Sequence, residues 1–242
     1  MYDPHHPEFE APTNPDIKIW RYMNLPKLVS MISTGSLWLS RADLLDDPHE
    51  GARGPMNAAK RREIYGEDAT QIIRALERSG PMMRRCVYVS CWHMAEIESV
   101  AMWKAYTTTG HGVAVYSTFR KLLNGVTDGK TFFAGVVKYV DPSTQCVGEN
   151  HMLTPFVHKR KSFEYEREVR LLYPAFDSGW QDPASVLPLG LPFEVDLARV
   201  IDGVRVSPDQ PRWFVNAVAS VVAKFNLNVE VAQSDLDADP VY

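Results

Sequence analysis

Between Ile17 and Val231 the hydrophobic pattern changes repeatedly from the two-residue period of a β-strand to the longer period of an α-helix, and every segment is short. Strands and helices do not alternate regularly, as they would in a doubly wound sheet. No linker and no internal repeat divides this stretch. A chain of 242 residues is long enough for one sizeable core. We therefore expect one α+β domain over residues 17–233, with a mixed or split, mainly antiparallel sheet flanked by short helices.

Local patterns predict the individual elements. The predicted strands cover residues 17–22, 37–39, 87–92, 113–116, 132–139, 169–173, 193–195, 200–206 and 228–231. The predicted helices cover residues 24–35, 56–79, 99–106, 119–123, 156–162 and 213–225, and a break near Gly66 in the second of these stays open. The first helix has the clearest boundaries, because Asn24 can cap it, Pro26 suits its first turn and Gly35 can end it.

The two ends differ from the predicted domain in composition. Residues 1–16 contain four prolines and few aliphatic side chains, which predicts a flexible, proline-rich arm. Residues 234–242 are rich in aspartate and read as an acidic tail.

Composition excludes several classes of protein. The formal charge of −4 argues against a surface built to coat nucleic acid. Three cysteines without a C-x-x-C pair argue against a disulfide framework or a cysteine zinc site. No apolar run approaches the roughly 20 residues of a membrane span, and no signal-peptide pattern opens the chain. We expect a soluble protein of a reducing cytoplasm, with no membrane partner and an oligomeric state that the sequence does not reveal.

The densest polar cluster covers residues 159–170. If the segment from Glu166 onward is a strand, Glu166, Glu168 and Arg170 project from one face, and the alternate residues, beginning with Val169, from the other. Arg170 can hold one carboxylate, and repulsion between the acids can raise the pKa of the other. The alternative is a solvated segment with surface ion pairs.

A second cluster is Asp46-Asp47-Pro48-His49-Glu50. These residue types can bind a metal ion, but aspartate before proline is also ordinary turn chemistry. We expect Asp46 and Asp47 to serve the turn, Glu50 to face the cleft or pair with a basic residue, and no metal to bind.

A third group is aromatic. Trp103 and Tyr106 lie three residues apart on one helical face, where core packing suits Trp103 and the Tyr106 hydroxyl needs a partner. Cys91 and His93, two apart on a predicted strand, form a weaker candidate for a nucleophile and its base.

Taken together, these segments resemble a family of bacterial and phage proteins known as a domain of unknown function. The motifs that carry the resemblance are Arg21-Tyr22, the glycine-to-serine segment 35–40, the Asp-Asp-Pro-x-Glu turn 46–50, the Ser-Cys-Trp segment 90–92, the Met-Trp-x-x-Tyr segment 102–106, residues 110–113, and 161–170 with its Tyr-Glu-x-Glu-x-Arg motif. The match covers most of residues 17–173 and assigns no activity.

The order of an arginine strand, a serine-bearing strand and a late Glu-x-Glu strand is more distantly similar to ADP-ribosyltransferases, including those that modify DNA in toxin systems. The resemblance implies an ADP-ribosyltransferase-like fold, with NAD as substrate and no metal. By the same resemblance, Arg21 holds NAD, Ser90 lies beneath the nicotinamide, and Glu168 or Glu166 is catalytic. The remaining candidates for substrate contact are Tyr22, Glu50, Trp103, Tyr106 and Arg170.

The sequence therefore leaves three functions open. The first is an NAD-dependent ADP-ribosyltransferase-like enzyme, a toxin or phage-defence effector that modifies a nucleic acid or a protein. The second is a non-catalytic module that binds nucleotides or nucleic acid through the basic runs 60–62, 84–85 and 159–161. The third is a metal-dependent nuclease or hydrolase that uses the Asp-Pro turn and the Glu166/Glu168 pair.

Overall fold

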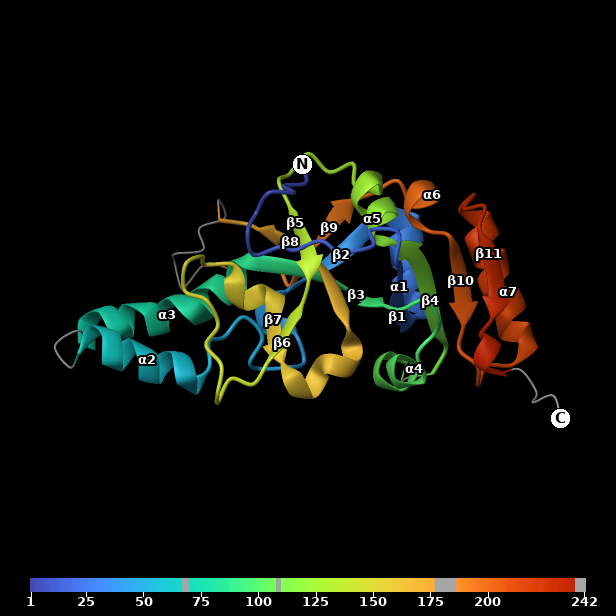
Figure 1. Cartoon of the computed structure of the whole chain (residues 1–242). Coiled ribbons are helices and arrows are strands. Elements are labelled where there is room, and N and C mark those ends of the chain that lie inside the picture. Colours follow the sequence, from blue (N-terminus) through green and yellow to red (C-terminus); the bar gives the residue numbers. More distant parts are fainter. Residues whose placement is uncertain (67–69, 108–109, 177–185, 238–242) are drawn as a thin grey trace.

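The computed structural model describes residues 1–66, 70–107, 110–176 and 186–237 of the chain. Figure 1 shows one sheet with helices on its faces and a helical hairpin that projects from the body. The helices are α1 (Leu25–Thr34), α2 (Pro55–Tyr65), α3 (Thr70–Cys86), α4 (Val100–Tyr106), α5 (Phe119–Gly125), α6 (Leu197–Val200) and α7 (Arg212–Lys224). The 3-10 turns include η1 (Ala42–Leu44), η3 (Thr154–Val157), η4 (Lys161–Glu166) and η5 (Asp235–Asp237).

The strands are β1 (Lys18–Asn24), β2 (Ser36–Arg41), β3 (Val87–Met94), β4 (Gly112–Thr118), β5 (Phe133–Val136), β6 (Lys138–Val140), β7 (His158–Arg160), β8 (Glu168–Pro174), β9 (Gly190–Glu194), β10 (Gly203–Val206) and β11 (Glu230–Gln233). Nine of them form one sheet in the order β11-β10-β4-β1-β3-β2-β9, with β8 against β3 and β5 against β8. Only β10 and β11 pair in parallel within it. The fold is a single α+β domain with a mainly antiparallel sheet, as predicted.

The sheet splits along one edge of β3. β8 pairs with β3 on one side along its length, from Val87 to His93. On the other side β1 pairs only with the end of β3, at His93 and Met94, and β2 pairs only near its start, at Tyr88 and Val89. The three residues from Ser90 to Trp92 therefore face the place where β1 and β2 diverge.

Helix α1 shows why the local sequence signals were informative. The Asn24 side chain accepts a hydrogen bond from the Lys27 amide, and Pro26 occupies the first turn. Gly35 ends the helix in the left-handed conformation, at φ 60°. The buried residues Leu28, Met31 and Ile32 form the apolar stripe that this spacing predicts.

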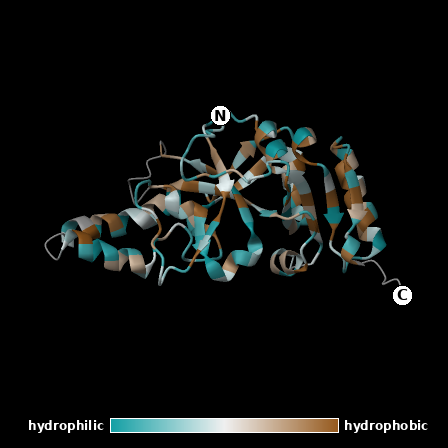
Figure 2. Ribbon diagram, in the orientation of Figure 1, coloured by the Kyte–Doolittle hydropathy of each residue, from teal (hydrophilic) through white to brown (hydrophobic). Residues whose placement is uncertain are grey.

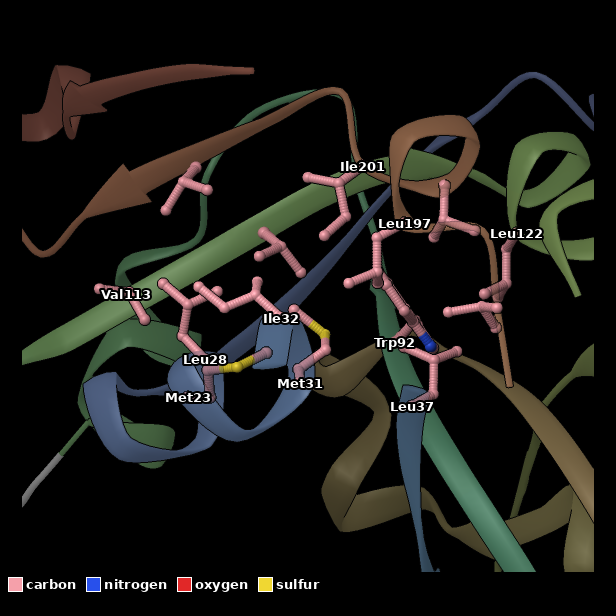
Figure 3. Close-up of a cluster of buried hydrophobic side chains, with 14 of the residues drawn as sticks. Met23, Leu28, Met31, Ile32, Leu37, Trp92, Val113, Leu122, Leu197 and Ile201 are labelled. Atoms are coloured by element: carbon pink, nitrogen blue, oxygen red, sulfur yellow. The ribbon is translucent and has the colours of Figure 1, made fainter. Parts of the chain in front are cut away.

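The main core lies between one sheet face and the helices α1 and α7, which contribute Leu28, Met31, Phe214 and Val218 to it. Figure 3 shows Met31 and Ile32 of α1 beside Leu37 of β2 and Trp92 of β3. Figure 2 shows hydrophobic residues concentrated on the sheet strands and more polar residues on the helical hairpin. A second cluster packs Phe156, Met83 and Val89 on the opposite face of the sheet.

The prediction of a helix over residues 156–162 is wrong. The chain instead forms η3, the short strand β7 and then η4, and β7 pairs in parallel with β6. Helical spacing was misleading here, because two 3-10 turns flank the strand and each places side chains three residues apart on one face.

The arm lies against the sheet. Phe9 is buried in the second cluster, and the Glu10 carbonyl accepts a hydrogen bond from the Val136 amide. One aromatic side chain thus anchors a segment whose prolines predicted a loose arm. Of the predicted acidic tail, the structure describes residues 234–237, where Ser234 is buried, and residues 238–242 lie outside the described part. Within the described residues, no helix combines the length and the apolar character that a membrane span requires.

Candidate functional site

The candidate site begins where η4 leads into β8. Glu166 ends the 3-10 turn, Arg167 has a left-handed backbone with φ 41°, and Glu168 begins the strand. In the antiparallel register Glu168 lies opposite His93 and Arg170 lies opposite Cys91. Residues directly opposite one another share a face of the sheet, so these four side chains belong to the same face.

The carboxylate of Glu168 is held by two cations. The Arg170 guanidinium donates to it through Nε at 2.7 Å and through Nη2 at 3.2 Å. The Lys159 ammonium, from β7, donates to the Glu168 carboxylate at 2.7 Å and to the Glu166 carboxylate at 2.5 Å. The two acids that the sequence singled out therefore converge on one lysine.

Glu50 completes what we call the acid network: Glu50, Lys159, Glu166, Glu168 and Arg170. Its carboxylate accepts two hydrogen bonds of 2.8 Å from Arg170 and lies 3.2 Å from the Lys159 nitrogen. This confirms that Glu50 pairs with a basic residue. Gly51, at φ 67°, allows the turn, and a Cβ there would lie 2.4 Å from the Phe156 ring.

The acid network is almost completely buried, since each of its side chains is at most 8% exposed. Removing charges from water costs several kcal/mol for each ion, and paired hydrogen bonds offset that cost only when the geometry is good. Three carboxylates face two cations here, so full ionisation leaves one negative charge in excess. This burial does not fit the alternative that the segment 159–170 is a solvated surface with ion pairs.

The excess charge is relieved at Glu166. Burial raises the pKa of its carboxyl group to about 7, and the hydrogen bond to Glu168 and the charge of Glu168 act in the same direction. For Glu168, burial also disfavours ionisation, but the charge of Arg170 and further hydrogen bonds hold the pKa well below its usual range. Glu168 is therefore a fixed anion, whereas Glu166 titrates near neutral pH.

Cys91 lies opposite Arg170 on the same face of the sheet as Glu168. Burial raises the pKa of the Cys91 thiol, and the charge of Glu168 raises it further. Burial also lowers the pKa of Arg21 to about 10. The raised pKa keeps the Cys91 thiol neutral, which argues against its use as a nucleophile.

Arg21 itself spans the split in the sheet. Its guanidinium donates to the Trp38 carbonyl of β2 at 2.7 Å and lies over the Trp92 ring, 5.8 Å from the ring centroid. In the register of β1, Arg21 lies beside Trp20, whose partner is His93, so Arg21 starts from the opposite face to Glu168. Arg21 and Glu168 therefore extend from opposite faces of the sheet, near the divergence of β1 and β2.

Tyr106, at the end of α4, stands over the same place. Burial raises the pKa of its phenol, and the charges of Glu166 and Glu168 raise it further. The residue is nevertheless 41% exposed. Tyr106 is therefore partly open to solvent while its phenol lies within electrostatic reach of both acids.

Three other predicted contact residues are buried and hydrogen-bonded within the fold. The Ser90 hydroxyl accepts a hydrogen bond from the Trp92 indole on the main-core face, away from Glu168. Tyr22 is buried, and its hydroxyl accepts from the Ser99 amide. Trp103 is buried against Tyr22 and donates to Glu98 at 2.9 Å. Tyr22 and Trp103 hold α4, and thereby Tyr106, in place.

The Asp-Pro turn forms as predicted, and Asp47 also has a cationic partner. Asp47 accepts from the His49 amide at 3.0 Å and from Arg160 at 2.8 Å. Burial raises the pKa of the Asp47 carboxyl, but the hydrogen bonds from Arg160 and His49 outweigh it, so the pKa is lowered. Within the described residues, no group of three or more histidine, cysteine, aspartate or glutamate side chains could hold a metal ion.

The basic runs also have partners inside the fold. Arg61 is buried against Glu149 at 2.8 Å, and the Arg84 guanidinium donates to the Pro48 carbonyl. Lys159 belongs to the acid network, and Arg160 forms an ion pair with Asp47. Arg61 and Lys159 are buried in ion pairs, so these two cations are not available to a nucleic-acid surface.

Two residues at the site, Lys159 and Tyr139, were missed as site residues, and His93 was considered only as a base for Cys91. Lys159 was read as surface charge, although it joins both acids. The Tyr139 hydroxyl accepts a hydrogen bond from the Glu168 amide at 2.8 Å. His93 lies 2.6 Å from the Glu166 carbonyl, where it can act only as a donor. The one available signal was that Lys159 and His93 lie in segments already noted for their chemistry.

Comparisons with known proteins find only distant similarity to this chain. Neither the protein-family models nor the curated protein sequences yield a match, so the expected family is not confirmed. Among solved structures, the chain is similar to DarT of Thermus sp. 2.9 in complex with ADP-ribosylated single-stranded DNA, with a TM-score of 0.42, 9% identity, and 93% and 95% of the two chains covered. A second similar structure is DarT of Thermus sp. 2.9 in complex with carba-NAD+, with a TM-score of 0.38, 10% identity, and 91% and 96% covered.

Proposed function

We propose that the protein is an NAD-dependent ADP-ribosyltransferase-like enzyme whose active site is the space bordered by Tyr106, Cys91 and the acid network. The observation that carries the proposal is the buried network in which Lys159 and Arg170 hold Glu166 and Glu168, beside the split in the sheet that Arg21 spans. The Arg21 guanidinium is a cation suited to phosphate, and the acid pair supplies an anion for a developing positive charge.

The chemistry requires a fixed negative charge. When the bond between the ribose and nicotinamide breaks, its electron pair leaves with the nicotinamide nitrogen, and the ribose gains oxocarbenium character, as in glycoside hydrolysis. Glu168 is the fixed anion of the pair, because Arg170 and Lys159 hold its pKa low. A preoriented carboxylate in a dry site stabilises that charge without reorganisation.

Glu166 supplies the second role. A nucleophile on the acceptor forms the new bond to the ribose carbon and must lose its proton. A carboxyl group with a pKa of about 7 is matched to take that proton at neutral pH. We therefore assign Glu168 to charge stabilisation and Glu166 to proton transfer.

Arg21 and Tyr106 complete the binding site. A guanidinium can grip a pyrophosphate through two parallel hydrogen bonds. The exposed side of the Tyr106 ring offers a surface on which the nicotinamide can stack. The acceptor, under this proposal, is a nucleic acid or a protein, and the role is that of a toxin or phage-defence effector in the cytoplasm.

The test is release of nicotinamide from labelled NAD, with DNA, RNA and protein acceptors supplied separately. Wild-type protein should release nicotinamide, and Glu168→Gln should lose a hundredfold or more of that rate. Glu164→Gln is the matched control, because Glu164 is an exposed acid of the same turn and should keep the rate.

Loss of stability must be separated from loss of chemistry. Glu50→Gln removes a carboxylate from the same two cations and measures what damage to the acid network alone does. If Glu50→Gln and Glu168→Gln lose activity in proportion to their loss of thermal stability, the acids are structural. Wild-type protein that neither binds nor cleaves NAD removes the proposal.

A further inference from the structure

The two acids of the pair are separated by a backbone turn that side chains must hold. Arg167 adopts a left-handed conformation that costs a non-glycine residue roughly 1–2 kcal/mol. Two backbone hydrogen bonds surround it: the Arg167 amide donates to the Glu164 carbonyl at 3.2 Å, and the Met94 amide donates to the Arg167 carbonyl at 2.9 Å. Neither bond holds the peptide carbonyl of Glu166.

His93 makes that contact. It is 4% exposed and lies opposite Glu168 in the pairing of β3 with β8. Its Nδ1 lies 2.6 Å from the Glu166 carbonyl oxygen. A carbonyl oxygen only accepts, so Nδ1 must carry the proton, and the neutral ring then has a free lone pair on Nε2.

This contact bears on where the Glu166 side chain points. Glu166 belongs to a 3-10 turn and not to β8, so strand alternation does not orient it. Its carboxylate accepts from Lys159 at 2.5 Å, and the peptide that follows Glu166 is the one that His93 contacts. The one side chain of β3 that grips this peptide is His93.

We propose that His93 is the positioning residue of the acid pair: by donating to the Glu166 carbonyl it holds the Glu166 carboxyl group beside Glu168 and Lys159. His93 touches none of the reacting atoms and acts only through Glu166. The importance of His93 for catalysis rests on the proposed function, but its effect on the position of Glu166 does not.

The charged surroundings of both residues are compatible with this role. Burial lowers the pKa of His93, and the charge of Arg167 acts in the same direction, while the hydrogen bond to the Glu166 carbonyl raises it; the net shift is downward, so the ring is neutral and keeps a single proton for that carbonyl. The Tyr22 ring lies edge-on at 6.2 Å. The groups that face the Glu166 carboxyl are Lys159 and Glu168, with the phenols of Tyr106, Tyr139 and Tyr165 also within electrostatic reach.

The test compares three variants by the titration of Glu166, followed through its side-chain carboxyl ¹³C signal. His93→Leu removes the donor. His93→Asn keeps a donor, because its amide nitrogen stands where Nδ1 stood. Trp20→Phe is the control for packing damage beside His93: the buried Trp20 lies opposite His93 in the pairing of β1 with β3, but its indole donates to the Ala95 carbonyl at 2.8 Å, just beyond β3, and to neither acid.

In His93→Leu the Glu166 midpoint should fall by about one unit, toward the value of a solvated carboxyl. His93→Asn should stay near wild type, and Trp20→Phe should lose stability without moving the midpoint. An unchanged midpoint in His93→Leu overturns the proposal. The same holds if Trp20→Phe moves the midpoint equally. Because the signal needs no NAD, failure here is distinguishable from failure of the proposed function, which only the nicotinamide assay reports.

Discussion

At the scale of single residues, the acid network shows how two chemically identical side chains acquire different properties. Glu168 is bonded to both Arg170 and Lys159, whereas Glu166 shares Lys159 alone. The difference in the number of cationic partners separates their pKa values in opposite directions. That separation is what the proposed division of roles requires.

Glu166→Gln should change how stability depends on pH. The pKa of Glu166 in the folded protein, about 7, lies above the ordinary value of 4.5, so the contribution of Glu166 to stability is largest below pH 4.5 and is lost as pH rises through 7. Glutamine mimics the neutral acid, so the variant should be more stable than wild type at pH 8, by roughly 1–3 kcal/mol. Urea unfolding at pH 5 and pH 8 measures this effect.

Glu164→Gln serves as the exposed-acid control and should keep the wild-type change between the two pH values. If Glu166→Gln instead loses stability equally at pH 5 and pH 8, the raised pKa of Glu166 is wrong.

At the scale of elements, strand alternation and end signals carried most of the predictable information. The alternation after Glu168 placed Glu168 and Arg170 on one face and Val169 and Leu171 on the other, and the structure confirms this arrangement. These patterns are local, so a single sequence is enough to reveal them.

Gly51→Ala should test how the Asp-Pro turn delivers Glu50 to the acid network. An added Cβ would meet the buried Phe156 ring at 2.4 Å, and φ is 67°. We expect a loss of about 2–4 kcal/mol, from left-handed strain together with overpacking. Thermal unfolding of the purified variant measures the loss.

Gly35→Ala provides the matched comparison, because Gly35 has φ 60° and nothing within 4 Å of an added Cβ. It should lose only about 1 kcal/mol. Equal losses in the two variants would show that contact with Phe156 is not what constrains the turn.

Contacts between elements that lie far apart in the sequence could not be predicted. Lys159 reads as part of a basic run, yet β7 turns it inward between two 3-10 turns to reach both acids. Ser90 was expected beneath a substrate, but its strand position puts it on the main-core face with Trp92. Which face of a strand receives the helices is set by tertiary packing, and a strand's own alternation does not reveal it.

At the scale of the whole molecule, the split between β1 and β2 brings together parts of the chain that are far apart in sequence. Arg21 comes from the first strand, Cys91 from the middle of the sheet and the acid pair from η4 and β8. The composition of the chain predicted one acidic domain but not this meeting point, since pairing partners are not encoded in local periodicity.

Calorimetric titration of NAD into the purified full chain tests the central claim, that this meeting point is a dinucleotide site. The account predicts saturable binding of one NAD per chain, weakened at least tenfold, or by about 1.4 kcal/mol, in Arg21→Gln, and unchanged in the exposed-acid variant Glu164→Gln. The absence of saturable binding by the wild-type protein, or equal binding by Arg21→Gln, would contradict it.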